Sequence, residues 1–175
     1  MRRYILAAAL ALIGAAPAQT GWAETVLPAV MSSDVKATDP VWSGAYITRD
    51  FGYMIYDTLF ALDEKLQVRP QMVDKWQASD DGLTWTFTLR DGLEWHDGTP
   101  VTGEDCVASL KRWSARDSMG QKLAASIAEY KIVDSRTFQI VLKQKFGPLL
   151  EALGKPSVAA PFMTPKKMAE TDPFT

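Results

Sequence analysis

The sequence predicts an α/β fold with a mixed sheet, hairpins and short helices. Two observations favour it. Residues 83–90 alternate strictly between apolar and polar side chains, which is typical of a half-buried strand, and residues 45–58 carry apolar side chains at helical spacing. With 175 residues, of which 47% are hydrophobic and 10% aromatic, the chain can form the core of one domain and is not expected to be disordered.

The elements of the first half follow from local signals. Residues 25–31 predict a short buried strand, and residues 32–44 a loop, because the Asp39-Pro40 pair disfavours helix before it. After the helix at residues 45–58, residues 59–62 predict a strand edge. Residues 70–77 predict a short helix that opens on a proline, where the missing N–H costs nothing.

The second half begins with a turn at Asp91-Gly92 that leads into a short strand at residues 93–95. Thr102 and Asp105 match a capping box, which predicts a helix over residues 103–115 with Cys106 on its inward face. Further helices are expected at 120–126, 148–153 and 165–170, and a hairpin of two strands at 130–133 and 137–142.

The N-terminus is typical of a secretory signal. Arg2 and Arg3 precede an apolar stretch over residues 4–16, and Gly21 and Ala23 supply the small residues of a cleavage site, so residues 1–23 are expected to be removed. About thirteen apolar residues are too few for a membrane-spanning helix, which needs roughly 20. With no cysteine nearby to carry a lipid, residues 24–175 are expected to be soluble in the periplasm.

Charge and cysteine usage exclude several classes of protein. Without Arg2 and Arg3 the 19 basic residues become 17, against 21 acidic ones, so residues 24–175 carry a net charge of −4. No basic run is present, which excludes nucleic acid as a partner. Cys106 is the only cysteine; an internal disulfide and a cysteine-rich metal site are therefore excluded, and no metal or cofactor is expected.

One long string carries a resemblance. Residues 79–102, SDDGLTWTFTLRDGLEWHDGTPVT, closely resemble the signature of the family 5 extracellular solute-binding proteins. The resemblance implies a type II periplasmic-binding-protein-like fold in which residues 24–175 form part of the first lobe. Family members are several times longer, so the chain is expected to be truncated. The string itself is interpreted as a fold signature, because its aromatic residues fall on one face of a strand.

The same resemblance implies the function. The protein would be the periplasmic substrate-binding component of an ATP-binding-cassette importer, a monomer that binds a peptide or similar small solute and delivers it to a membrane permease without catalysis. The solute could be a peptide, nickel, haem or an opine. Two alternatives stay open: an exported hydrolase that uses His96 with Asp97, and an inactive truncated fragment. No G-x-S-x-G motif accompanies His96, and one imidazole beside one carboxylate makes no zinc site.

The loop at residues 38–48 is the candidate ligand site. Trp42, Ser43, Tyr46 and Thr48 lie just beyond the first predicted strand, and ligands of open α/β sheets bind outside the carboxyl ends of strands. Aromatic rings there could stack on a ligand while main-chain groups bind its amides, although core packing of Trp42 or Tyr46 is equally compatible with the pattern. The loop at residues 155–157 is a weaker second candidate.

Overall fold

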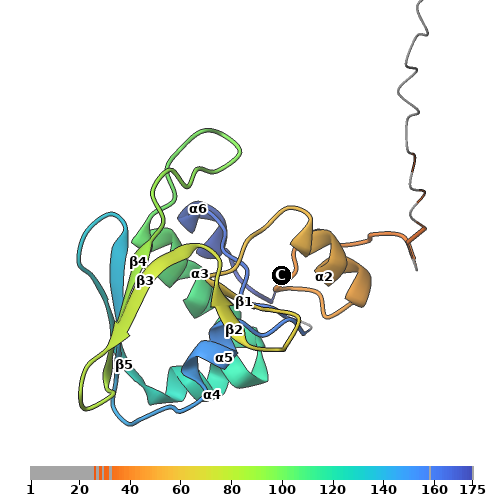
Figure 1. Ribbon diagram of the computed structural model, residues 1–175. Helices are drawn as coiled ribbons and strands as arrows, with labels where there is room; N and C mark the ends of the chain where they lie inside the picture. Colours follow the sequence, from red (N-terminus) through yellow and green to blue (C-terminus); the bar gives the residue numbers. More distant parts are fainter. Residues whose placement is uncertain (1–25, 27, 29, 32, 158, 175) are drawn as a thin grey trace, which may run out of the picture. The chain divides into compact units, whose positions relative to one another are not determined.

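The fold is organised around a four-stranded antiparallel sheet (Figure 1). The structure, a computed structural model, describes residues 26, 28, 30, 31, 33–157 and 159–174, so the predicted signal segment 1–23 lies outside the described residues. The sheet has the order β3-β4-β6-β5, so its edges are β3 and β5. Its strands are β3 (Val73–Ala78), β4 (Thr84–Leu89), β6 (Thr137–Leu142) and β5 (Ile127–Ile132).

The alternating pattern of β4 is what gives the sheet its two faces. Phe87 and Leu89 are buried, and Phe87 lies opposite Phe138 of β6 with the two rings stacked at 5.4 Å. The intervening threonines point to the other face, where Thr86 accepts a hydrogen bond from Gln139 at 3.0 Å. The strands predicted at residues 83–90 and 137–142 are therefore confirmed, because side chains alternate across a strand.

Helix α3 (Gly103–Arg116) packs on the apolar face of the sheet, and α4 (Ser118–Ser126) follows it (Figure 1). The predicted capping box of α3 is confirmed: the Thr102 side chain accepts from the Asp105 N–H at 3.3 Å, and the Asp105 carboxylate accepts from the Thr102 N–H at 2.9 Å. Cys106 and Trp113 are fully buried. Burial raises the pKa of the Cys106 thiol, so this cysteine is a small core residue.

Five shorter elements surround this layer. Strands β1 (Phe60–Leu62) and β2 (Val68–Pro70) pair as an antiparallel hairpin. Helix α2 (Tyr46–Tyr53) precedes the hairpin, α5 (Leu149–Leu153) contacts β1, and α6 (Lys166–Ala169) contacts α3. One core cluster joins both sheets with α3, α4 and α5. The largest fully buried side chains of the described residues are Trp113, Phe60, Phe87, Phe138, Phe162, Leu59, Leu89, Leu110, Leu123, Ile140, Leu149 and Leu153.

The helix predicted at residues 70–77 is wrong. Pro70 ends β2, and the next residues form β3, which pairs with β4 from Val73 opposite Leu89 to Ala78 opposite Trp85. Proline fits here because β2 ends at this residue. Without β3, the main-chain N–H and C=O groups of β4 that point away from β6 would also be unpaired. Pairing with β4 therefore overrides the local helix signal.

Four other boundaries differ from the sequence predictions. The buried strand at 25–31 is wrong where it can be judged, since Val26 and Val30 are 72% and 95% exposed and no described residue there is in a strand. Helix α2 ends at Tyr53, since the chain beyond it turns to bridge Thr58 with Phe162. Residues 93–95 contribute only a bridge at Glu94, and β5 starts earlier, at Ile127. No helix among the described residues has the length and apolarity that crossing a membrane requires.

Candidate functional site

The loop that carries the predicted site residues is fixed by a partly buried ion pair. The guanidinium of Arg112 on α3 donates to both carboxylate oxygens of Asp39, at 3.0 and 2.6 Å. Burial alone would raise the pKa of Asp39, but hydrogen bonds from Arg112 and from the Val41 N–H, together with the Arg112 charge, outweigh it and lower this pKa below its ordinary value. The start of the loop is thus tied to the main helix.

Two of the four predicted site residues present rings to solvent. Trp42 is 43% exposed and Tyr46 is 66% exposed, so the alternative that they pack in the core is wrong for both. The guanidinium of Arg49 lies over the Tyr46 ring at 5.0 Å from its centroid. Exposed aromatic rings of this kind can stack on a solute.

The other two predicted residues hold the loop together from within. Thr48 is 1% exposed, and its hydroxyl donates to the Ala37 carbonyl at 3.0 Å. The Ser43 hydroxyl accepts from the Ala45 N–H at 3.3 Å and from the Thr48 hydroxyl at 3.4 Å. These two side chains therefore help to hold the loop that carries Trp42 and Tyr46; Thr48 is buried there, and Ser43 is partly exposed.

The two candidate loops, residues 38–48 and 155–157, are bonded to Arg116 and Asp117, which are consecutive residues at the junction of α3 and α4. Arg116 donates to the Trp42 carbonyl at 2.9 Å. The next residue, Asp117, forms an ion pair with Lys155 of the second loop and also caps α4 by accepting from the N–H groups of Met119 and Gly120, both at 2.9 Å. The sequence did not single out Arg112, Arg116 or Asp117, because their partners lie far away along the chain.

The surface formed by the Trp42 and Tyr46 rings is open to solvent in this structure. The small cavity beside it, about 180 Å³, is lined by residues 38–41 of the loop and by Tyr56 and Arg112, not by Trp42 or Tyr46. The described residues of the loop offer rings, main-chain groups and the nearby cations Arg49 and Arg116 for non-covalent contacts. Such an arrangement can bind a solute on one side and has no nucleophile with a paired base.

His96 lies in an exposed turn, as the sequence predicts. With Trp95, Tyr56 and Lys167 it lines a cavity of about 500 Å³ in which no described serine, threonine or cysteine offers a nucleophile. The neighbouring Asp97 accepts hydrogen bonds from the hydroxyl and the N–H of Thr99, at 2.6 and 3.1 Å. These bonds lower the pKa of the Asp97 carboxyl, and the bond from the hydroxyl has the largest effect. Among the described residues no group of three metal-ligating side chains comes together.

The comparisons with known proteins agree with this fold. Residues 67–175 match the family model described as bacterial extracellular solute-binding proteins, family 5 Middle. A protein of Sinorhizobium fredii named probable peptide ABC transporter periplasmic-binding protein is 44% identical over 165 residues, which are 94% of this chain and 30% of that protein.

Solved structures show the same architecture. The periplasmic binding protein MoaA from A. tumefaciens R10, in complex with mannopinic acid, has a TM-score of 0.65 and 29% identity over 77% of this chain and 28% of its own. Listeria monocytogenes OppA bound to peptide has a TM-score of 0.66 and 20% identity over 78% of this chain and 30% of its own.

The fold is therefore that of the type II periplasmic binding proteins, with the mixed α/β composition that the sequence predicts. Within this class the chain belongs to the family 5 bacterial extracellular solute-binding proteins. The chain spans about 30% of the length of the curated relatives that it matches.

Proposed function

We propose that the protein acts, as a monomer and without catalysis, as the periplasmic substrate-binding component of an ABC importer. It binds a peptide or similar small solute and delivers it to a membrane permease. The observation that carries this proposal is the 44% identity to the Sinorhizobium fredii protein, whose name assigns it to peptide transport. In the same proposal residues 1–23 are the secretory signal that directs the protein to the periplasm.

The proposed solute contact is made by the exposed rings of Trp42 and Tyr46. Ser43 and Thr48 fix the loop from inside, and Arg116 fixes the Trp42 carbonyl. Rings held in this way lose little freedom when a solute stacks on them, which favours binding. Residues 24–175 would form part of the first lobe and one wall of a cleft, and the opposite wall would come from sequence equivalent to the remaining length of the relatives.

A binding titration with a matched pair of variants tests this proposal. Dipeptides, tripeptides and mannopinic acid are titrated into the full-length protein, in which both walls of the proposed cleft are present, while tryptophan fluorescence and melting temperature are recorded. A solute that binds only the native state raises the melting temperature. Trp42→Ala should weaken the binding of the active solute by about tenfold or more, the cost of truncating an aromatic contact residue.

Trp76→Ala is the matched control, because Trp76 is 40% exposed but lies on β3 and packs edge-on against Phe60. It should leave the affinity unchanged. Equal losses in both variants, or no loss in Trp42→Ala, would contradict the assignment of the loop. The absence of binding for every solute in the set would contradict the proposed function itself.

A further inference from the structure

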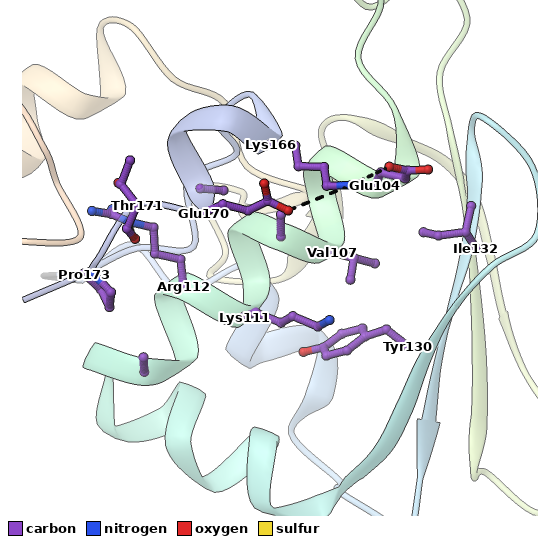
Figure 2. Close-up of a pocket in the computed structure, with 13 residues that line it drawn as sticks. Glu104, Val107, Lys111, Arg112, Tyr130, Ile132, Lys166, Glu170, Thr171 and Pro173 are labelled. Carbon is purple, nitrogen blue, oxygen red and sulfur yellow. Dashed lines mark hydrogen bonds and ion pairs between the residues drawn. The ribbon is translucent and has the colours of Figure 1, made fainter.

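A groove runs along α3 (Figure 2), and none of Trp42, Ser43, Tyr46 and Thr48 lines it. Its floor is one stripe of α3 with Val107, Ala108, Lys111 and Ala115, and Tyr130 and Ile132 of β5 form one wall. Helix α6 and the segment after it form the other wall. The groove has a volume of about 550 Å³. It is thus bounded on one side by an edge strand of the sheet.

The main chain of that edge strand is free along the groove. In an antiparallel pair, residues that share hydrogen bonds with the neighbouring strand alternate with residues whose N–H and C=O groups point away from it. The Val133 N–H donates to the Thr137 carbonyl, so these two residues form a hydrogen-bonded pair. Because bonded pairs alternate along the strands, Lys131 and Gln139 form the next one. The main-chain groups of Tyr130 and Ile132 therefore point away from β6. No described residue outside the sheet bonds these groups.

The side chains of this edge are suited to contact with another chain. Ile132, the last residue of β5, is 44% exposed on the groove side, where edge strands in proteins that stay single usually carry a charge. The charged pair of β5, Glu129 and Lys131, alternates in sequence with Tyr130 and Ile132 of the groove wall and so projects to the opposite face. The floor contains alanines, which leave room for incoming side chains.

One cation in the groove has no carboxylate partner. The ammonium of Lys111 lies 5.7 Å from the centroid of the Tyr130 ring, and the two side chains point toward each other in Figure 2. No described carboxylate lies within ion-pair distance of Lys111, whereas Lys166 at the rim pairs with Glu104 at 2.9 Å and with Glu170 at 3.8 Å. The groove is thus complementary to a segment with an acidic side chain.

We propose that this groove is a docking site for an extended segment of a partner protein, which adds to β5 as a fifth strand. Its apolar side chains would cover the α3 floor and Ile132, and an acidic side chain would meet Lys111. A second copy of this chain fits less well, because antiparallel pairing of two β5 strands about Tyr130 would bring two Lys111 ammonium groups toward each other. This site is separate from the solute contact proposed above.

The test uses the full chain and a labelled, capped peptide of sequence Val-Thr-Glu-Thr-Val, followed by fluorescence anisotropy. The wild-type chain should bind it saturably. Lys111→Glu should weaken binding by about tenfold or more, as expected for an ion pair turned into a like-charge contact, and a peptide with lysine in place of glutamate should recover affinity for that variant. Ile132→Pro, which removes an outward N–H, should abolish binding.

Three controls make the outcome decisive. Lys122→Glu changes an exposed lysine of α4 outside the groove and should bind like the wild type, and circular dichroism melts show that each variant is folded. Binding that survives Lys111→Glu and Ile132→Pro together, or that is lost in Trp42→Ala, overturns the proposal. So does a dimer of the wild-type chain in sedimentation equilibrium that Ile132→Pro dissociates, since the occupant would then be a second copy.

Discussion

Arg112 and Asp39 form a two-point ion pair in which each terminal nitrogen of the guanidinium donates to one carboxylate oxygen. The Arg112 side chain is only 7% exposed, and its Nε donates to the Thr171 carbonyl at 3.2 Å. A single side chain of α3 therefore ties together the loop at residues 38–42 and the segment after α6, which are more than a hundred residues apart in the sequence.

Asp39→Ala should destabilise the fold, because it leaves the buried Arg112 charge without its carboxylate. Removing one partner of a fully buried pair costs about 3–5 kcal/mol, and since Asp39 is 39% exposed we expect about 2 kcal/mol. Urea unfolding followed by circular dichroism measures the change. Asp50→Ala is the control: it breaks an exposed pair with Arg49 and should change the free energy of unfolding by about 0.5 kcal/mol or less.

The stability of the protein should fall in acid partly through Asp39. Its pKa is lower in the folded state than the ordinary value of 3.8, so the unfolded chain binds the proton more tightly. The contribution is complete above the ordinary pKa and is lost as the pH falls through the lower folded value. Urea unfolding at several pH values from roughly 5 to 2 should show a shallower loss for Asp39→Asn than for the wild type. Parallel curves for both proteins would refute this prediction.

Gly120→Ala should destabilise α4, although alanine has the higher helix propensity. A Cβ atom at this position would lie 2.8 Å from the Ser114 Cα and 3.2 Å from the Trp113 ring. The gain in propensity is about 1 kcal/mol, whereas forcing α4 away from α3 costs about 1–3 kcal/mol. Thermal melts should show a lower melting temperature. Gly147→Ala is the control, since apart from Gly147 and its two chain neighbours no atom of the described residues lies within 4 Å of its added Cβ.

Thr102→Ala should weaken the start of α3. The substitution removes the acceptor for the Asp105 N–H and leaves the Asp105 carboxylate with the Thr102 N–H alone in the capping box. We expect a loss of about 1 kcal/mol in the free energy of unfolding, while Thr102→Ser should retain most of the stability. A serine variant as unstable as the alanine variant would show that the methyl group, not the hydroxyl, is what matters.

Local patterns were sufficient wherever one element carried its own signal. The alternation that ends in Phe87 and Leu89 predicted β4, and Thr102 with Asp105 predicted where α3 starts. Strand β3 could not be predicted in this way, because its side chains after Val73 are exposed and give no alternation of burial. Its strand conformation depends on the hydrogen bonds to β4, which are a tertiary property.

The candidate site was predicted only in part. Its loop could be located from Trp42 and Tyr46, but whether a ring is exposed depends on what the fold brings next to it. From the sequence alone, the Thr48 hydroxyl could equally bind a solute. Only the structure shows that this hydroxyl donates to the Ala37 carbonyl. The supports of the loop, Arg112 and Arg116, act over more than seventy positions in sequence, so no local motif reveals them.

The strand order also fixes when the sheet can form during synthesis. Strand β4 pairs on one side with its sequence neighbour β3, but its other partner, β6, begins only at Thr137, after α3, α4 and β5. A nascent chain that stops before Thr137 holds no more of this sheet than a two-stranded hairpin, which is marginally stable in water. Closure of a pair so distant in sequence is slow. The growing polypeptide thus lacks its complete sheet until β6 has been made, which is compatible with the export proposed above, because a chain crosses a translocation channel unfolded.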